Sequence, residues 1–169
     1  MTHNLNADLD EDIDIDDEIA DSDEGLNEPF DPTKIRVDTR KITIDLVLKR
    51  IEYRELDLAP DFQRQAIWTN EAKSRLIESI LIRIPLPAFY IDATNDDKWL
   101  VIDGLQRLTA LKQFIFDKSL ALTGLQYLSE LENKKYDELP RKYQRRILET
   151  ELTLSIIESG TPPAVKYNI

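Results

Sequence analysis

The amino-acid sequence predicts an α/β (α+β) fold, with a small mixed sheet flanked by helices. An apolar stripe at helical spacing over residues 76–84 predicts an amphipathic helix. The continuous apolar run at residues 99–102 is typical of a buried strand. An Asp-Gly pair ends that run, and helical spacing begins at once over residues 105–116. This alternation of strands and helices favours one layered domain over residues 34–169.

Helix-start residues divide the first half of the domain. Thr43 is placed to cap a helix whose apolar residues follow over positions 46–51. Residues 55–58 are predicted to form a short strand, and Thr69 precedes the clearest helix of the sequence. The apolar stripe of that helix is Leu76, Ile77, Ile80, Leu81 and Ile84, and we expect Lys73, Arg75 and Glu78 to lie mostly outside it.

Proline and turn residues divide the second half. Pro85 and Pro87 end the preceding helix and lead into an extended segment at residues 88–92. Residues 93–97 have the composition of a hairpin loop, and the strand that follows is expected to be covered on both faces. The remaining elements are a polar helix at 141–148, a strand at 152–157, a turn at 159–163 and the proline-led start of another helix.

The negative charge of the chain belongs to its first 33 residues. The whole sequence of 169 residues has 33 acidic and 22 basic side chains, a net charge of −11. Residues 1–33 contain thirteen of the acidic side chains and no Lys or Arg, so the remaining residues carry a net +2. This composition predicts a disordered acidic tail over residues 1–33. A second interpretation is that the tail mimics nucleic acid and covers a basic surface on this protein or a partner.

Missing residue types exclude several kinds of chemistry. The chain has no Cys, and its single His is His3, in the acidic tail. The predicted domain therefore has no Ser-His-Asp triad, no thiolate nucleophile and no conventional zinc site. No apolar run approaches the roughly 20 residues that span a bilayer, and the acidic start is unlike a signal peptide. We expect a cytoplasmic protein without a membrane partner.

The strand-to-helix junction at residues 99–114 is the first candidate site. Ligands of α/β layers bind beyond the carboxyl ends of strands, and the start of a helix favours an anion such as phosphate. Gly104 allows close approach to the backbone, and Arg107 should point past the helix start toward the anion. Asp103 is suited to a divalent cation or a water, and Gln106 to a hydrogen bond with a ligand. The structural alternative is that Asp103 caps the helix and pairs with Arg107.

The sequence contains two further polar clusters. Gln63 and Arg64 lie in an apparent loop, where they are free to face a ligand or to remain on an ordinary surface. The third cluster is basic and consists of Arg141, Lys142, Arg145 and Arg146. A solvated helix face is the simpler interpretation of these residues, although they are able to contact phosphates. Neither cluster matches a Walker motif, and a net +2 is a weak nucleic-acid footprint.

Three motifs of this sequence resemble those of one family. Residues 60–68, PDFQRQAIW, resemble its P-x-F-Q-R-x-x-x-W opening. Residues 75–91, RLIESILIRIPLPAFYI, resemble its I-E-S-I-L-x-x-I-P-x-P segment, and residues 103–111, DGLQRLTAL, resemble its D-G-Q-Q-R-L-x-x-L signature. The family is the N-terminal domain of GmrSD-type restriction systems. The resemblance covers residues 43 to 169 and leaves out the acidic tail.

The resemblance implies a fold similar to the ParB and sulfiredoxin nucleotide-binding domains. It also implies a nucleoside-triphosphate-binding and hydrolysing domain of bacterial defence against phage or foreign DNA, beside an HNH-type nuclease domain or subunit. By motif position, Gly104, Leu105, Arg107, Gln63 and Arg64 would bind the nucleotide. Asp103, Gln106 and Arg107 would be catalytic, with Asp103 also holding Mg²⁺ or another divalent cation.

The sequence departs from the family pattern at two places. Leu105 stands where the commonest signature has Gln, so that side chain has no hydrogen-bonding group. Family members continue into an Arg-Asn-Gly-rich segment and further helices, so we expect the domain to be incomplete at its C-terminus. Two alternatives therefore stand beside the domain that binds and hydrolyses a nucleoside triphosphate: a non-enzymatic, DNA-associated specificity or scaffold module, and a truncated inactive remnant.

Overall fold

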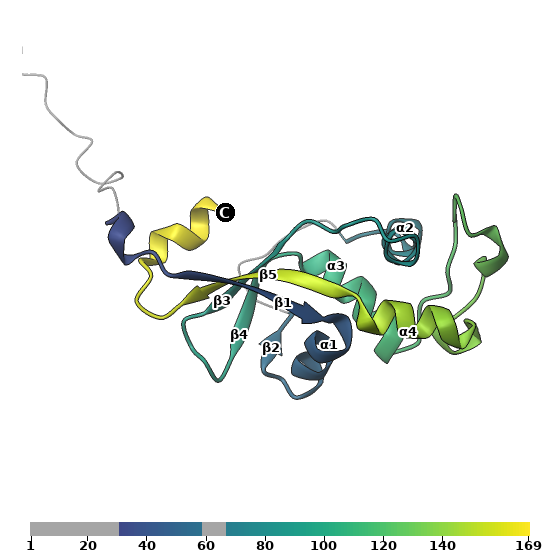
Figure 1. The fold of residues 1–169 in the computed structure, drawn as a ribbon, viewed down its shortest axis with the longest axis horizontal. Coiled ribbons are helices and arrows are strands. Elements are labelled where there is room, and N and C mark those ends of the chain that lie inside the picture. Colours follow the sequence, from purple (N-terminus) through teal and green to yellow (C-terminus); the bar gives the residue numbers. More distant parts are fainter. Residues whose placement is uncertain (1–30, 59–66) are drawn as a thin grey trace, which may run out of the picture.

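The computed structural model describes residues 31–58 and 67–169, and it has a mixed sheet of five strands in the order β1-β5-β3-β4-β2 (Figure 1). The strands are β1 (Val37–Thr43), β2 (Leu56–Asp57), β3 (Phe89–Ala93), β4 (Trp99–Asp103) and β5 (Glu151–Glu158). The predicted α/β class with a small mixed sheet is confirmed. A specific likeness to ParB or sulfiredoxin stays a prediction.

Parallel and antiparallel pairs alternate across the sheet. β1 runs antiparallel to β5, from Val37 opposite Ile157 to Thr43 opposite Glu151. β3 is parallel to β5 and antiparallel to β4, with a shift in register between Tyr90 and Ile91. β2 is parallel to β4 and forms the second edge. The central strand β3 is thus hydrogen-bonded to β4, and the carboxyl end of β4 leads into the candidate site.

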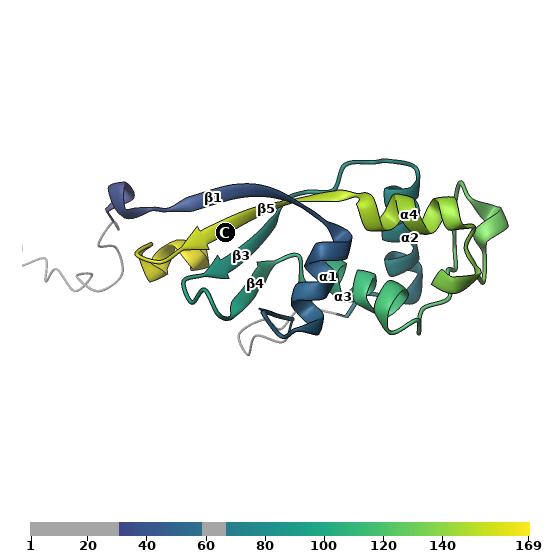
Figure 2. The ribbon, with the colours of Figure 1, turned by 60° about the horizontal axis from the view of Figure 1, so that its bottom comes forward.

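The α-helices of the described residues lie toward one end of the sheet, away from the β3–β4 hairpin (Figures 1 and 2). They are α1 (Ile44–Glu52), α2 (Asn70–Leu81), α3 (Leu105–Leu111) and α4 (Arg141–Glu149). The predicted caps are confirmed, because the hydroxyl of Thr43 accepts from the N–H of Leu46 and that of Thr69 from the N–H of Ala72. α3 continues into a π-helix, Lys112–Phe116, and the two together span the helix predicted at residues 105–116. The proline-led helix near the C-terminus is a 3₁₀ helix, Pro163–Asn168.

One hydrophobic core joins the sheet to the helices. Phe89 and Ile91 of β3 and Val101 of β4 are fully buried. They belong to the same buried cluster as Leu108 and Phe114, which follow the strand-to-helix junction. The core therefore holds the first turn of α3 at the carboxyl end of β4.

The prediction that the polar residues of α2 lie outside its buried face was partly wrong. Lys73 and Glu78 are only 6% and 3% exposed. Glu78 is buried because the loop at residues 123–128 folds over this side of the helix. Each carboxylate oxygen of Glu78 accepts a hydrogen bond from the Gln126 N–H, and Oε2 also accepts from the next two backbone N–H groups, at 3.0–3.1 Å. Ile84 is 50% exposed because α2 ends at Leu81, before the stripe would reach it.

Two other expectations need correction or fall outside the described residues. β4 is not covered completely on both faces, because Leu100 and Ile102 are only half-buried. The predicted disordered tail lies mostly among residues 1–30, which are outside the described part, and the first described element is a 3₁₀ turn at Pro32–Lys34. No helix among residues 31–58 and 67–169 is long and apolar enough to cross a bilayer.

Candidate functional site

Gly104 forms the junction between β4 and α3. Its φ of +107° is a left-handed conformation that favours glycine. A Cβ built at this position would lie 2.3 Å from Cδ1 of the fully buried Phe89 ring. Both the backbone conformation and the packing therefore require the absence of a side chain at the start of α3.

Arg107 leans toward the beginning of its helix, as predicted, but contacts its own fold there. Its guanidinium donates hydrogen bonds to the carbonyl oxygens of Pro87 and Ala88, the second at 3.2 Å. It lies 4.0 Å from the centre of the Phe89 ring and 3.6 Å from Oδ2 of Asp103. Burial lowers the pKa of Arg107, the charge of Asp103 opposes that effect, and the group remains protonated at neutral pH. In this structure Arg107 fixes the segment before β3 against α3.

Asp103 is the accessible acidic group at this edge. It is the last residue of β4, and its side chain is 50% exposed, compared with 12% for Arg107. The pair is the helical i,i+4 contact that the structural alternative anticipated. Because the carboxylate is half exposed, a ligand outside the sheet edge can reach it.

Gln106 connects the two principal motifs. Its side-chain Oε1 accepts a hydrogen bond of 3.2 Å from the backbone N–H of Trp68. Trp68 ends the motif at residues 60–68, so the structure brings the end of that motif to the first turn of α3. Gln63 and Arg64 themselves lie outside the described residues.

The first turn of α3 has backbone donors available for an anion. The first backbone bond within the helix runs from the Leu108 N–H to the Gly104 carbonyl oxygen. The N–H groups of Leu105, Gln106 and Arg107 therefore have no acceptor within the helix. They lie next to Asp103, on the side where Gln106 holds the end of the other motif.

Asp103 could hold a divalent cation only together with other ligands. Across the residues that the structure describes, no three acidic or histidine side chains form a metal-binding group. Mg²⁺ often binds one or two carboxylates, several waters and the phosphates of a substrate. A single carboxylate beside the N–H groups that begin α3 fits that kind of site.

The basic cluster on α4 acquires a member that the sequence did not indicate. Three of its residues, Lys142, Arg145 and Arg146, line a cavity together with Arg83, which follows α2. Arg83 is about 60 residues away in the sequence, and helical spacing could not have paired it with α4.

Comparison with known proteins places the chain in a family. The fold is a mixed α/β domain whose polar edge lies at a strand-to-helix junction, and residues 44–166 match the model of the GmrSD restriction endonuclease N-terminal domain. The chain belongs to this family, as its motifs indicated, and it is accordingly a component of a restriction system. No curated protein and no solved structure shows significant similarity to it.

Proposed function

We propose that this domain binds and hydrolyses a nucleoside triphosphate at the edge formed by β4 and α3, in support of DNA restriction. The observation that carries the proposal is the hydrogen bond between Trp68 and Gln106. It joins two polar motifs that are about 40 residues apart in the sequence and places their junction beside a half-exposed carboxylate. Family membership supports the connection to restriction.

The residues of the site divide into ligand-facing and positioning groups. The N–H groups of the first turn, at Leu105 and Gln106, would bind phosphate oxygens, and the left-handed turn at Gly104 would present them. Asp103 would orient the attacking water and share a divalent cation with the phosphates. That cation would neutralise charge that develops on the phosphoryl group. Arg107 would act mainly by positioning, because its guanidinium already binds two carbonyl oxygens.

Gln63 and Arg64 would complete the site from the facing motif. Phosphoryl transfer depends mainly on positioning and on stabilising charge, so a site without histidine is chemically sufficient. We further propose that the domain acts with an HNH-type nuclease domain or subunit and reaches DNA directly or through that partner, in the cytoplasm.

Phosphate release by the full chain with Mg²⁺ and each common nucleoside triphosphate tests this function. Asp103→Asn removes the charge at nearly constant shape, and we expect release to fall at least roughly a hundredfold. The matched control is Asp97→Asn, in the exposed hairpin loop, which should leave the rate unchanged. Equal rates in the two variants, or no release by the parent chain with or without DNA, would refute the proposal.

One observation favours the non-enzymatic module as a second candidate. The Asp103–Arg107 pair and the engaged guanidinium are what a purely structural junction would show. That module would bind nucleotide as a switch, or not at all, and would show salt-dependent DNA affinity without turnover. Nucleotide binding measured by calorimetry, compared with phosphate release, separates the two candidates.

A further inference from the structure

A cavity of about 430 Å³ lies where the end of α2 meets α4. Its lining carries four cations and one carboxylate: Arg83, Lys142, Arg145, Arg146, Glu149 and Thr150. Arg145 and Glu149 also line an adjoining cavity of about 240 Å³, where Arg141 and Asp45 balance each other in charge. None of these residues belongs to the proposed nucleotide site.

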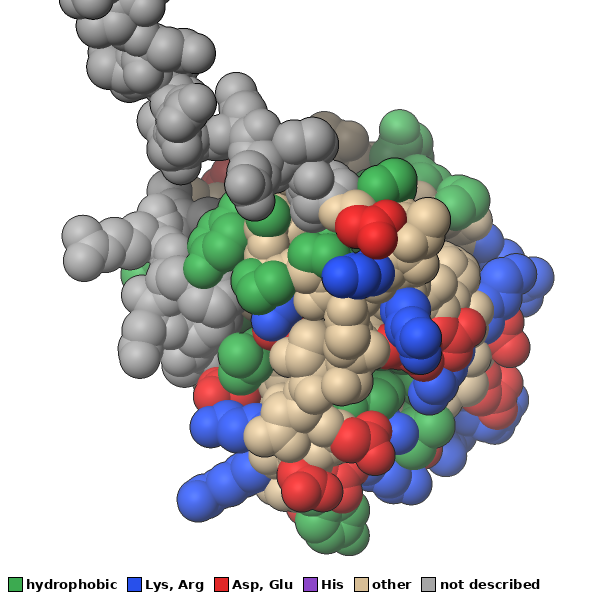
Figure 3. All heavy atoms as spheres, turned by 90° about the vertical axis from the view of Figure 1, so that its left-hand side faces the viewer, with side chains coloured by type: hydrophobic (Ala, Val, Ile, Leu, Met, Phe, Trp, Pro, Cys, Tyr) green, Lys and Arg blue, Asp and Glu red, His purple; other side chains and the backbone are tan. Residues whose placement is uncertain are grey.

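Most of these cations have no carboxylate partner. Throughout residues 31–58 and 67–169, no acidic side chain lies within ion-pair distance of Arg83, Lys142 or Arg145. Elsewhere, Lys49, Lys98 and Lys118 each pair with an aspartate, at 3.2, 3.3 and 2.8 Å. At the end of the sheet shown in Figure 3, acidic and basic side chains are likewise interspersed. Positive charge is thus concentrated at the α2–α4 cavity, although residues 34–169 have a net charge of only +2.

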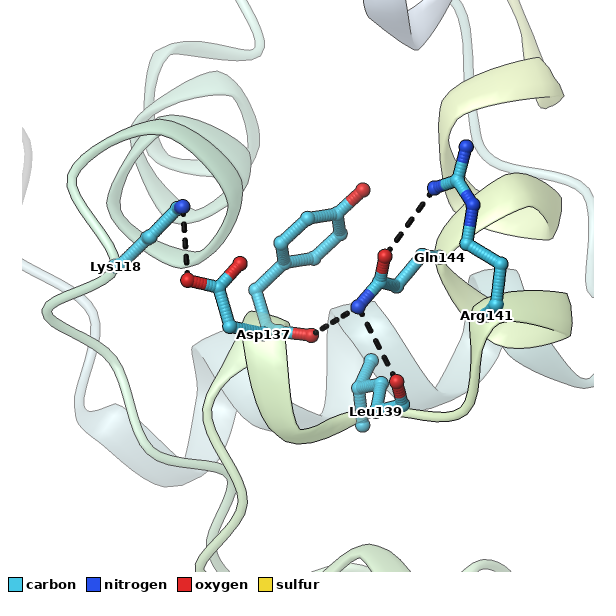
Figure 4. Close-up of polar contacts among 6 residues, drawn as sticks. Lys118, Asp137, Leu139, Arg141 and Gln144 are labelled. Carbon is cyan, nitrogen blue, oxygen red and sulfur yellow. Dashed lines mark hydrogen bonds and ion pairs between the residues drawn. The ribbon is translucent and has the colours of Figure 1, made fainter.

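The helix that carries these cations is held firmly. The guanidinium of Arg146 donates a 3.0 Å hydrogen bond to the Leu81 carbonyl oxygen, at the end of α2. Within α4, the Gln144 amide donates to the carbonyl oxygens of Tyr136 and Leu139, which precede the helix, both at 3.2 Å (Figure 4). The side chain of Arg141 donates to Oε1 of the same glutamine. The cationic face is therefore presented by an anchored scaffold.

Arg83 occupies a backbone position that would suit glycine. It follows α2 with a φ of +66°, in the left-handed turn that commonly ends a helix. The turn is closed by hydrogen bonds from Arg83 N–H to Ile80 and from Ile84 N–H to Ser79. Glycine has no steric penalty in this conformation, whereas arginine does. The arginine therefore adds a cation to the cavity at a conformational cost.

We propose that the α2–α4 cavity and its rim bind the phosphate backbone of duplex DNA. Three of the four lining cations are arginines, which grip phosphates through two parallel hydrogen bonds. Residues three and four apart on a helix have Cβ atoms about 5–6 Å from one another, so Lys142 can share one face of α4 with Arg145 and Arg146 and contact the same phosphate strand. Several unpaired cations in a row suit a polyanion, and a restriction-system domain meets DNA as its polyanion. This inference does not depend on the nucleotide site.

Binding of the full chain to a labelled 30-base-pair duplex, followed by fluorescence anisotropy across a salt series, tests the surface. Lys142→Gln with Arg145→Gln should weaken binding at least roughly tenfold at 0.1 M salt and lower the salt slope by about 2. The charge-matched control is Arg40→Gln with Lys98→Gln, which removes two exposed, paired cations outside the cavity. The control should keep most of the affinity and slope.

Arg83→Gly separates binding from folding. Removing the left-handed arginine relieves backbone strain, so the melting temperature should stay equal or rise while DNA affinity falls several-fold. Unchanged affinity and slope in both cavity variants would overturn the proposal, and so would equal losses in the control. Binding of an acidic protein segment here, with DNA affinity unaltered by the variants, would also overturn it.

Discussion

Arg107 shows how one side chain can join three segments of a small domain. It starts on α3, crosses the Phe89 ring of β3 and donates to the carbonyl oxygens of Pro87 and Ala88. Its role near the sheet edge is therefore first to hold neighbouring backbone. A ligand bound at that edge would depend on this arrangement even without touching the guanidinium.

Replacing this arginine should lower stability before it affects chemistry. We expect Arg107→Ala to reduce the free energy of unfolding by about 1–2 kcal/mol, because the partly buried Ala88 carbonyl oxygen loses a charged donor, whereas the exposed Pro87 carbonyl oxygen can bind water instead. Arg107→Lys should recover only part of that loss, because a single ammonium cannot reproduce the planar fork. Urea unfolding of both variants measures the effect, and a parent-like midpoint for Arg107→Ala would contradict the positioning role.

The position of Gly104 leads to a second prediction for a single residue. Gly104→Ala should destabilise the domain by about 2–4 kcal/mol, because a left-handed conformation and a 2.3 Å contact with Phe89 add together. Gly160→Ala is the matched control, because its φ is also positive, +91°, but no atom lies within 4 Å of the added Cβ. Thermal melts should show a much smaller loss for the control. Equal losses would mean that packing against Phe89 contributes little.

Among the elements, α2 is distinguished by the loop folded over it. Glu78 binds the backbone of residues 126–128, and Glu132 binds the N–H groups of Gly124 and Leu125 at 2.8 and 3.1 Å. Two carboxylates thus accept hydrogen bonds from backbone N–H groups that a helix or sheet would otherwise pair, in a loop with little regular secondary structure. The same loop places Thr123 N–H within 3.0 Å of the Ser74 hydroxyl.

Removing the buried carboxylate should release this loop. Glu78→Ala leaves three backbone N–H groups without an acceptor, and we expect a loss of about 2–4 kcal/mol in unfolding free energy. Hydrogen exchange should accelerate most at the amides of residues 126–128. Glu130→Ala, at an exposed position of the neighbouring turn, is the control and should change neither measurement. Slow exchange retained in Glu78→Ala would show that other contacts order the loop.

The molecule as a whole should lose stability in acid. Burial raises the pKa of Asp92, but its hydrogen bonds with Lys166 and Thr94 and the charge of Lys166 outweigh burial and lower the pKa overall. Hydrogen bonds from Gly124 and Leu125 likewise lower the pKa of Glu132. A carboxylate with a lowered pKa contributes stability above its unfolded pKa, and that contribution disappears as the pH falls through the folded value.

Unfolding midpoints should therefore be constant near neutrality and fall below about pH 4. Asp92→Asn should lose part of this dependence, because residue 92 then no longer titrates, and it should also lower stability near neutrality, because Lys166 loses its carboxylate partner at 2.6 Å. Urea titrations from pH 7 to pH 3 measure both curves. An Asp92→Asn curve parallel to that of the parent chain would assign the acid sensitivity to other groups.

The sequence predicted those parts of the fold that local signals determine. Thr43 and Thr69 begin helices because their hydroxyls accept from N–H groups three residues later. The burial of Glu78 and the contacts of Arg107, which the sequence did not predict, involve distant segments. Glu78 is buried by a loop about 50 residues away, and Arg107 finds carbonyl oxygens about 20 residues before it. Helical periodicity carries no information about such partners.

The order of strands has a consequence for how the chain acquires its structure. β5 is the last strand along the described chain, yet it lies between β1 and β3, and β1 and β3 are not neighbours. The two earlier parts of the sheet can therefore unite only when residues 151–158 arrive, more than 100 positions after β1. Such distant pairing costs loop-closure entropy and slows folding. During synthesis, the edges of β1 and β3 that await β5 would stay unpaired until nearly the whole described chain had emerged.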